Sequence, residues 1–201
     1  MIYVIITASI NNKIGIINDS HRQFKYMDSI QQLLTLIGDD TIKIIIVENN
    51  GVRPTYLDNF NCDILYTNNN IINFFNKGGN ELLDIKEVIN QYNIQDDDMI
   101  IKLTGRYKLL NSQFINLVKD NNHDAFVKFY NVCTHEYMND DCVLGLYAIK
   151  CKYLKDFSYN FIKSPECEFA EYIRENINNI MEIKDLGLEC CFADDYRTII
   201  V

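Results

Sequence analysis

The chain has 201 residues, of which 48% are hydrophobic and 23% are charged. These values are typical of a folded globular protein of one domain and disfavour a disordered chain. The formal net charge is −9. Because a surface that binds duplex nucleic acid needs clustered Lys and Arg, this acidic balance disfavours nucleic acid as a partner.

The start of the sequence and its cysteines are typical of a cytoplasmic protein. Residues 1–7, MIYVIIT, lack the basic region and cleavage site of a signal peptide and predict a first β-strand. No apolar run approaches the roughly 18–20 residues that a membrane span requires. The seven cysteines include no C-x-x-C pair, so we expect free thiols in place of a zinc knuckle or redox motif.

Short apolar runs alternate with helical patterns along the chain. We expect strands over residues 3–7, 42–47, 62–67, 99–103, 125–130 and 142–149, and one or two short strands within 183–201. Helices are expected over 24–37, along an apolar stripe at 82, 85, 88 and 89, around 114–118, and from 164 to about 180. Ser164 suits an N-cap and Pro165 a first helical turn. This alternation predicts an α/β domain with a mainly parallel central sheet flanked by helices.

The segment from residue 76 to residue 107 carries the clearest chemical signal. NKGGNELLDI opens an amphipathic helix, and the strand at 99–103 runs into Thr104-Gly105-Arg106. Glycines let a backbone approach a ligand closely, and the first amides of a helix attract anions. Open α/β sheets bind ligands beyond the carboxyl ends of their strands. The segment therefore predicts a site for a phosphorylated ligand, with an ordinary β-α-β unit as the alternative.

Several common catalytic motifs are absent from the sequence. There is no G-x-S-x-G elbow, no Walker A loop and no G-x-G-x-x-G fingerprint. Their absence disfavours a hydrolase, a P-loop NTPase and a standard dinucleotide dehydrogenase.

The order of these features resembles the nucleotide-binding half of GT-A-type, GT-2-like glycosyltransferases. ITAS at 6–9 is similar to the loop that contacts the nucleoside, IIVENN at 45–50 to an acidic turn, and NKGGNE at 76–81 to a glycine loop. The string KLTGRY at 102–107 resembles one in glycosyltransferase-like proteins of bacteria and large DNA viruses. The resemblance covers roughly residues 1–175.

The resemblance implies one GT-A-like, Rossmann-like domain over residues 1–201. Residues 1–110 would form its nucleotide-binding half and residues 111–201 its acceptor half. The location would be the cytoplasm, or a host's cytoplasm for a viral protein.

One departure from the family concerns the metal. Such proteins usually end the fourth strand in D-x-D, whose carboxylates bind Mn²⁺ or Mg²⁺ and so neutralise the leaving diphosphate. This chain has Thr104-Gly105-Arg106 there. An arginine would supply a fixed positive charge instead, so no metal ligands are predicted, although a metal requirement is not excluded. The acidic triplet 96–98 precedes the strand and would lie at the wrong end of the sheet.

The resemblance also implies a set of donor-binding residues. Thr7, Ala8 and Ser9 would adjoin the base and ribose, Arg22 would close over them, and Glu48 and Asn49 would accept hydrogen bonds. The diphosphate and sugar would meet Lys77, Gly78, Asn80, Lys102, Thr104, Gly105 and Arg106. The alternatives are a surface lysine before a helix cap at 77, a structural salt bridge at 106, and ordinary loop ends elsewhere.

A transferase that inverts the anomeric centre needs a carboxylate to take the proton of the acceptor hydroxyl. In the family this is an acidic residue at the start of a helix, and Glu166 occupies that place best, ahead of Glu168 and Glu171. The alternative is acidic enrichment at a helix N-terminus for dipole reasons. Asp140 and Asp141 are weaker candidates for acceptor binding.

Three functions remain open on these grounds. The first is transfer of a sugar from a UDP- or GDP-type donor to a glycan or glycoconjugate, with Arg106 and Glu166 as catalytic residues. The second is a sugar nucleotidyltransferase, although residues 8–15 hold one glycine and no arginine where those enzymes have a glycine- and arginine-rich loop. The third is an inactive binding module, which the missing D-x-D supports.

Overall fold

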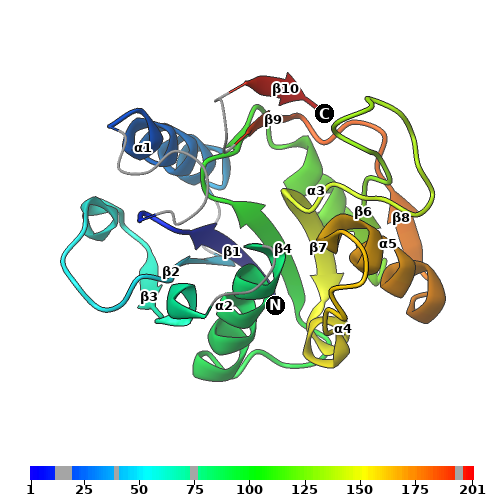
Figure 1. Cartoon of the computed structure of the whole chain (residues 1–201), viewed down its shortest axis with the longest axis horizontal. Coiled ribbons are helices and arrows are strands. Elements are labelled where there is room, and N and C mark those ends of the chain that lie inside the picture. The colour runs from blue at the N-terminus through cyan, green and yellow to red at the C-terminus, as the bar shows by residue number, and fades with distance from the viewer. Residues whose placement is uncertain (12–19, 39–40, 73–76, 193–196) are drawn as a thin grey trace.

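The computed structural model describes residues 1–11, 20–38, 41–72, 77–192 and 197–201 (Figure 1). At the centre of this part is a seven-stranded sheet with the strand order β3-β2-β1-β4-β7-β6-β8. Its strands are β1 (Ile2–Ala8), β2 (Ile42–Glu48), β3 (Asp63–Tyr66), β4 (Met99–Thr104), β6 (Ala125–Val127), β7 (Leu146–Lys150) and β8 (Ile180–Glu182). Among them β7 pairs antiparallel with both neighbours, and the other pairs are parallel. The predicted mainly parallel sheet is therefore confirmed.

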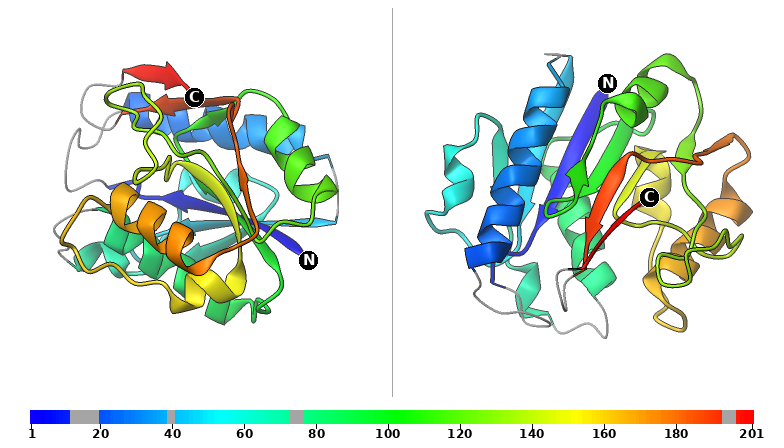
Figure 2. Two further views of the ribbon diagram at one scale, coloured as in Figure 1. Left: turned by 90° about the vertical axis from the view of Figure 1, so that its right-hand side faces the viewer. Right: turned by 90° about the horizontal axis from the view of Figure 1, so that it is seen from above.

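Helices cover both faces of the sheet, as expected (Figure 2). One face packs against α1 (Ser20–Leu36) and α3 (Gln113–Asp120), and the other against α2 (Lys77–Gln91), α4 (Cys151–Asp156) and α5 (Pro165–Asn176). Because successive side chains of a strand point to opposite faces, Val4 and Ile6 pack on the α1 side. Tyr3 and Ile5 pack on the α2 side. The result is a three-layer α/β/α arrangement.

A smaller sheet lies on the α1 side of the large one. It consists of β5 (Lys108–Leu109), β9 (Leu188–Cys191) and β10 (Thr198–Ile200), with β9 between the other two. Two 3-10 turns, η1 (Tyr56–Asn59) and η2 (Asn69–Ile71), complete the described elements. Because β5 begins two residues after Arg106, the small sheet extends from the carboxyl end of β4.

Some predicted boundaries were wrong. The strand expected over 142–149 begins only at Leu146, because Leu144 and Gly145 form a turn. The ring of Tyr107 packs against Gly145, where an added Cβ would lie 2.3 Å from a ring atom. The strand expected over 125–130 ends at Val127, and α5 ends at Asn176 because Ile180–Glu182 joins the sheet as β8.

Two other expectations can be compared directly with the structure. All seven cysteines are free, which agrees with the sequence prediction. Within the described ranges, the helices are too short or too polar to cross a membrane.

Candidate functional site

The topological switch point of the sheet lies between β1 and β4. From β1 the chain moves outward through β2 and β3, and it then returns to the other side of β1 to form β4. Thr7 at the end of β1 is in register with Thr104 at the end of β4. Ligands of open α/β sheets bind in the crevice outside such a point. The structure therefore brings Thr7, Ser9, Thr104, Gly105 and Arg106 to one edge, as the sequence predicted.

The turn from Thr104 to Tyr107 is tied closely to β1. The amide of Gly105 donates to the carbonyl of Thr7 at 2.9 Å, and the amide of Tyr107 donates to the carbonyl of Thr104 at 2.8 Å. A Cβ on Gly105 would lie 2.9 Å from Cε1 of Tyr26 and 3.0 Å from the carbonyl oxygen of Thr7. Glycine is thus required here by close packing, and the turn sets the direction of Arg106.

We predict that Gly105→Ala lowers the free energy of unfolding by about 1–3 kcal/mol, because the new methyl group overpacks against the Tyr26 ring and rigid backbone. Urea denaturation followed by circular dichroism measures this loss. Gly38→Ala is the matched control, since a Cβ there meets nothing within 4 Å. Equal midpoints for the two variants would contradict the packing argument.

Arg22 reaches from α1 to the end of β1 and is 3% exposed. Its Nη2 donates to the carbonyl of Ser9 at 2.9 Å and to the hydroxyl of Tyr26 at 3.2 Å. Within the described residues, its Nη1 is buried without a hydrogen-bond partner, and so is the hydroxyl of Thr7. Buried polar atoms nearly always have a partner, so these two atoms require an explanation. An anionic ligand at the switch point would satisfy the guanidinium.

Arg106 provides a second guanidinium at the same edge. Its Nε donates to the carbonyl of Cys191 at 2.9 Å, which ties it to β9, and its Cζ lies 5.1 Å from the ring centroid of Tyr107. Among the described residues, no acceptor for its two terminal nitrogens is found. The side chain is half-buried. These contacts leave the forked end of Arg106 available for an oxyanion.

Glu48 bonds to groups of the protein itself. Its buried carboxylate accepts hydrogen bonds from the amides of Ile10 and Asn50, at 3.0 and 3.1 Å, and forms an ion pair with Arg53 at 2.9 Å. These contacts join the ends of β1 and β2. The oxygens of Glu48 are thus used within the protein, and its contact with a base or ribose stays a prediction.

Asn49 also bonds to the protein, through a buried network on Asp84 of α2. Asp84 is fully buried and accepts from Nδ2 of Asn49 at 2.9 Å, the hydroxyl of Thr67 at 2.7 Å and Nδ2 of Asn69 at 2.8 Å. The network joins the loops that follow β2 and β3 to α2 at the carboxyl edge of the sheet. The amide nitrogen of Asn49 is thus used within the protein, and the predicted acceptance of a ligand hydrogen bond by its oxygen stays a prediction.

Burial raises the pKa of Asp84 to about 7, and hydrogen bonds from Asn69, Thr67 and Asn49 oppose that rise. A raised native pKa means that the folded protein binds more protons than the unfolded chain between about pH 4 and 7. The contribution of Asp84 to stability should therefore fall as pH rises through this range, by up to about 4 kcal/mol at 1.36 kcal/mol for each pKa unit. Unfolding free energies of wild type and Asp84→Asn at pH 4, 5.5 and 7 measure it. A difference between the two proteins that does not change with pH would contradict this prediction.

Lys102 is buried beneath the site and makes three contacts. Its ammonium forms an ion pair with Oε2 of Glu81 at 2.6 Å and donates to the hydroxyl of Thr104 at 2.7 Å and the carbonyl of Leu144 at 2.8 Å. An ammonium has three donors, so none remains for a phosphate. In the structure Lys102 instead fixes Glu81 and Thr104, and its ligand contact stays a prediction.

In the chain α2 follows β3 and precedes β4, so the first turn of the helix lies at the same edge of the sheet. Lys77 is its first residue and Gly78 and Gly79 follow in the first turn, as predicted. Nδ2 of Asn80 donates to the carbonyls of Asn69 and Ile72, so this amide holds η2 against the helix. Asn76, which belongs to the same motif, lies outside the described residues. Ligand contacts of Lys77 and Gly78 stay predictions.

Glu166 lies in the first turn of α5, whose N-cap forms as expected: the hydroxyl of Ser164 accepts from the amide of Cys167 at 3.2 Å. Glu166 is half-buried. Burial raises the pKa of its carboxyl, and the carboxylates of Asp141 and Glu81 raise it further. A carboxylate with a raised pKa near a cleft is suited to proton transfer.

The other predicted acidic residues are already bonded or lie outside the cleft. Glu168 accepts from the amides of Asn160 and Ile162, at 2.7 and 2.6 Å, and so shapes the preceding loop. Glu171 pairs with Lys163 at the surface. Asp141 is buried and accepts from Nδ2 of Asn131 at 2.6 Å, while Asp140 is exposed. Sequence reasoning did not single out Glu81, although it stands four residues after Lys77 in the glycine motif.

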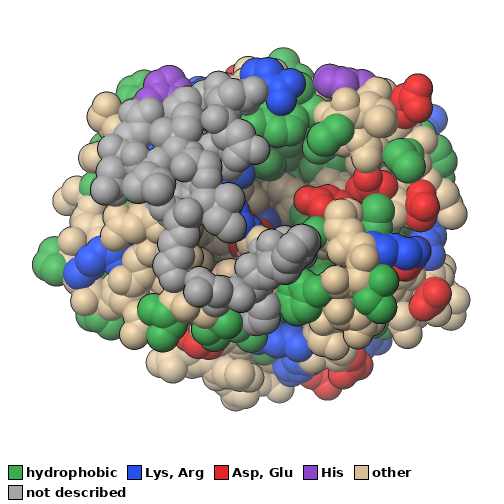
Figure 3. Space-filling view, viewed as in Figure 1, with side chains coloured by type: hydrophobic (Ala, Val, Ile, Leu, Met, Phe, Trp, Pro, Cys, Tyr) green, Lys and Arg blue, Asp and Glu red, His purple; other side chains and the backbone are tan. Residues whose placement is uncertain are grey.

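One face of the molecule is hollowed. Figure 3 shows the hollow near the middle of the molecule, with basic side chains inside it and acidic side chains along one wall. Arg22 belongs to α1 and Arg106 follows β4, whereas Glu166 belongs to α5. The carboxylate of Glu81 lies near both sides, because it raises the pKa of Arg106 and the pKa of Glu166. The site can therefore hold an anion beside a carboxylate that accepts a proton.

Three solved structures resemble the chain. A putative nucleotide-diphospho-sugar transferase from Desulfovibrio desulfuricans G20 has a TM-score of 0.56 at 8% identity, over 90% of this chain and 79% of that one. HddC from Yersinia pseudotuberculosis has a TM-score of 0.54 at 16% identity, over 91% of this chain and 90% of that one. A 4-diphosphocytidyl-2C-methyl-D-erythritol synthase has a TM-score of 0.53 at 10% identity, over 92% of this chain and 90% of that one. The chain has a GT-A-like fold. No protein-family model and no curated protein matches the sequence.

The GT-A-like fold allows a test of the metal that its family implies. β4 ends at Thr104, whose hydroxyl already accepts a hydrogen bond from the ammonium of Lys102. The guanidinium of Arg106 follows two residues later. Mn²⁺ and Mg²⁺ need carboxylate oxygens, and two fixed cations at this point would repel them. Asp96 and Asp98 are no substitute: Asp98 bonds the N-terminus at 2.7 Å, ahead of β4 at the opposite edge. These residues do not fit a divalent metal.

Proposed function

We propose that the protein is a glycosyltransferase that moves a sugar from a nucleotide-diphosphate donor to a hydroxyl of a glycan or glycoconjugate. The observation that supports this most is the buried Nη1 of Arg22 near the switch point of the sheet, for which the described part of the chain supplies no hydrogen-bond partner. Leaving such a donor unpaired costs about 1–3 kcal/mol, and more for a charged group, so its position favours a bound oxyanion. A diphosphate meets this need, and the GT-A-like fold supports a nucleotide-sugar as its carrier.

In this proposal the chain's own cations replace a metal. Arg22 and Arg106 would bind the two phosphates, and Lys77 with the first amides of α2 would add positive potential. Negative charge grows on the diphosphate as its bond to the sugar breaks, so preorganised guanidinium groups would lower the barrier. Transfer should therefore proceed in the presence of EDTA.

Glu166 would act as the general base. Its carboxylate would take the proton of the acceptor hydroxyl while that oxygen attacks the anomeric carbon and the bond to the diphosphate breaks. Its raised pKa supports this role, because a base is most effective when its pKa lies near the working pH. The ion pair of Glu81 with Lys102 would keep a second carboxylate fixed beside it.

Product analysis tests the proposal. Incubation with UDP- and GDP-sugars and a mixed glycan acceptor should release nucleoside diphosphate, with slow release by hydrolysis when no acceptor is present. Pyrophosphate released from a nucleoside triphosphate and a sugar phosphate would identify a nucleotidyltransferase instead. No release from any donor, with or without Mn²⁺, would favour an inactive binding module.

A further inference from the structure

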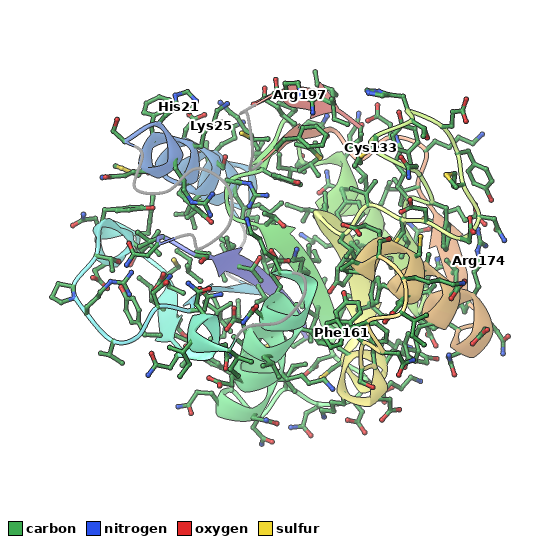
Figure 4. The ribbon with its side chains drawn as sticks, in the orientation of Figure 1. His21, Lys25, Cys133, Phe161, Arg174 and Arg197 are labelled. Atoms are coloured by element: carbon green, nitrogen blue, oxygen red, sulfur yellow. The ribbon has the colours of Figure 1, made fainter. Side chains whose placement is uncertain are left out.

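A cavity of about 240 Å³ lies between the loop of residues 131–136 and β10, outside the residues assigned to the donor. Six of its lining residues carry the argument: Val132, Cys133, His135, Phe192, Arg197 and Ile199. We call it the β10 cavity. Figure 4 labels Cys133 on the loop and Arg197 beside β10.

The lining combines apolar walls with a cation. Cζ of Arg197 lies 5.1 Å from the ring centroid of Phe192, and the amide of Phe192 donates to the carbonyl of Arg197 at 2.9 Å. Val132 and Ile199 supply half-buried aliphatic surface, and His135 adds an imidazole. An arginine stacked on an aromatic ring beside apolar walls suits a ligand with a flat apolar part and an anionic group.

The loop that forms one wall is held in shape by Asn131. Its Oδ1 accepts from the amides of Cys133 at 2.9 Å and Thr134 at 2.8 Å, and its backbone pairs with Glu136. His135 has a φ of 61°, which a residue with a side chain seldom adopts. The surrounding hydrogen bonds maintain this conformation, so the wall is formed before any ligand arrives.

The β10 cavity is linked to both sides of the candidate site. Phe192 follows Cys191, whose carbonyl accepts from Nε of Arg106 at 2.9 Å. On the other wall, Asn131 donates to Asp141 at 2.6 Å, and Asp141 is one of the carboxylates that raise the pKa of Glu166. Figure 3 shows apolar surface with basic and histidine side chains above the central hollow. The segments that line the cavity are therefore bonded to residues on both sides of the candidate site.

We infer that the β10 cavity binds the non-reacting end of the acceptor, and that this end is an apolar group carrying an anionic substituent. Arg197 and His135 would meet the anion, while Val132, Phe192 and Ile199 would cover the apolar part. The acceptor hydroxyl would then point toward Glu166. The acceptor role rests on the proposed function, whereas the binding of an apolar anion does not.

Cys133 is exposed in the cavity wall and reports on binding. Alkylation of its thiol by iodoacetamide is followed by peptide mass spectrometry with increasing phenyl phosphate. Phenyl phosphate should slow labelling several-fold and saturably, and inorganic phosphate should slow it much less because it lacks the ring. Equal labelling rates with and without phenyl phosphate would overturn the inference.

Two variants locate the protection. Val132→Phe fills the cavity and Arg197→Gln removes its cation, so each should abolish the effect of phenyl phosphate. Lys184→Gln, which removes an exposed cation outside the cavity, should retain it. Circular dichroism of each variant separates loss of binding from loss of fold. Protection that survives in both folded cavity variants would show that phenyl phosphate binds elsewhere, and the inference would be wrong.

The acceptor role is tested with pairs of 4-carboxyphenyl and methyl glycosides of several hexoses. The carboxyphenyl member should have about a tenfold lower KM, which corresponds to about 1.4 kcal/mol. Arg197→Gln should abolish that preference with little change in kcat. Transfer without any preference would refute the acceptor role alone. Protection of Cys133 without transfer to any glycoside would instead count against the proposed function and leave the binding site standing.

Discussion

Glu166→Gln should lower kcat for transfer by about 10²–10⁴-fold, the usual contribution of a general base. The amide keeps the size of the side chain but cannot accept the proton of the acceptor hydroxyl. Donor affinity should change little, because Glu166 lies on the α5 side and the two arginines lie on the β1–β4 side. Initial rates at saturating donor and calorimetric titration of the donor measure the two quantities.

The pH profile provides an independent check on Glu166. A base acts when deprotonated, so kcat/KM should fall on the acid side, around a pKa above the ordinary range of glutamate because burial raises it. Glu171→Gln is the matched control, since it removes a surface carboxylate from the same helix. If Glu166→Gln retained the wild-type rate and the same acid limb, Glu166 would be a helix-capping acid only.

Replacing the two arginines should produce the largest loss of donor affinity. Hydrogen bonds to charged groups contribute about 1.5–3 kcal/mol each, so Arg22→Gln or Arg106→Gln should raise the donor Kd by about 10- to 150-fold. Arg22→Gln also removes the unpartnered buried nitrogen, so the free protein should lose little stability from that atom. Calorimetric titration with UDP- and GDP-sugars measures the affinities.

A charge-matched control separates local binding from overall electrostatics. Lys155→Gln removes one positive charge at the opposite edge of the sheet, where Lys155 pairs with Asp96. It should leave the donor Kd within about twofold of wild type, because exposed charges beyond a Debye length of about 10 Å are screened. Affinities that fell equally in all three variants would mean that net charge alone, and no built site, attracts the nucleotide.

The layers of the fold followed from the sequence because periodicity reports burial directly. The continuous apolar runs became the central strands, and the stripe of Leu82, Ile85, Val88 and Ile89 became the buried face of α2. Short elements escaped prediction. β5 is two residues long and exists because β9, about 80 residues later, pairs with it, so no local pattern announces it.

The site was predictable in position but less so in chemistry. Strand ends and glycines pointed to the edge where Arg22 and Arg106 lie. The sequence did not reveal which polar groups the protein uses itself. Glu48 bonds to the amide of Ile10 and Lys102 to the carbonyl of Leu144, and only the folded chain brings these distant segments together.

Hydrogen exchange of the backbone amides, measured on the wild-type protein with and without saturating UDP or GDP, tests the diphosphate site most directly. With nucleotide bound, we expect slower exchange in peptides covering residues 6–10 and 103–108, which meet at the switch point between β1 and β4. Peptides covering residues 95–99, at the opposite edge, should be unchanged. Protection at 95–99 with none at 6–10 and 103–108 would contradict a diphosphate site between the two arginines.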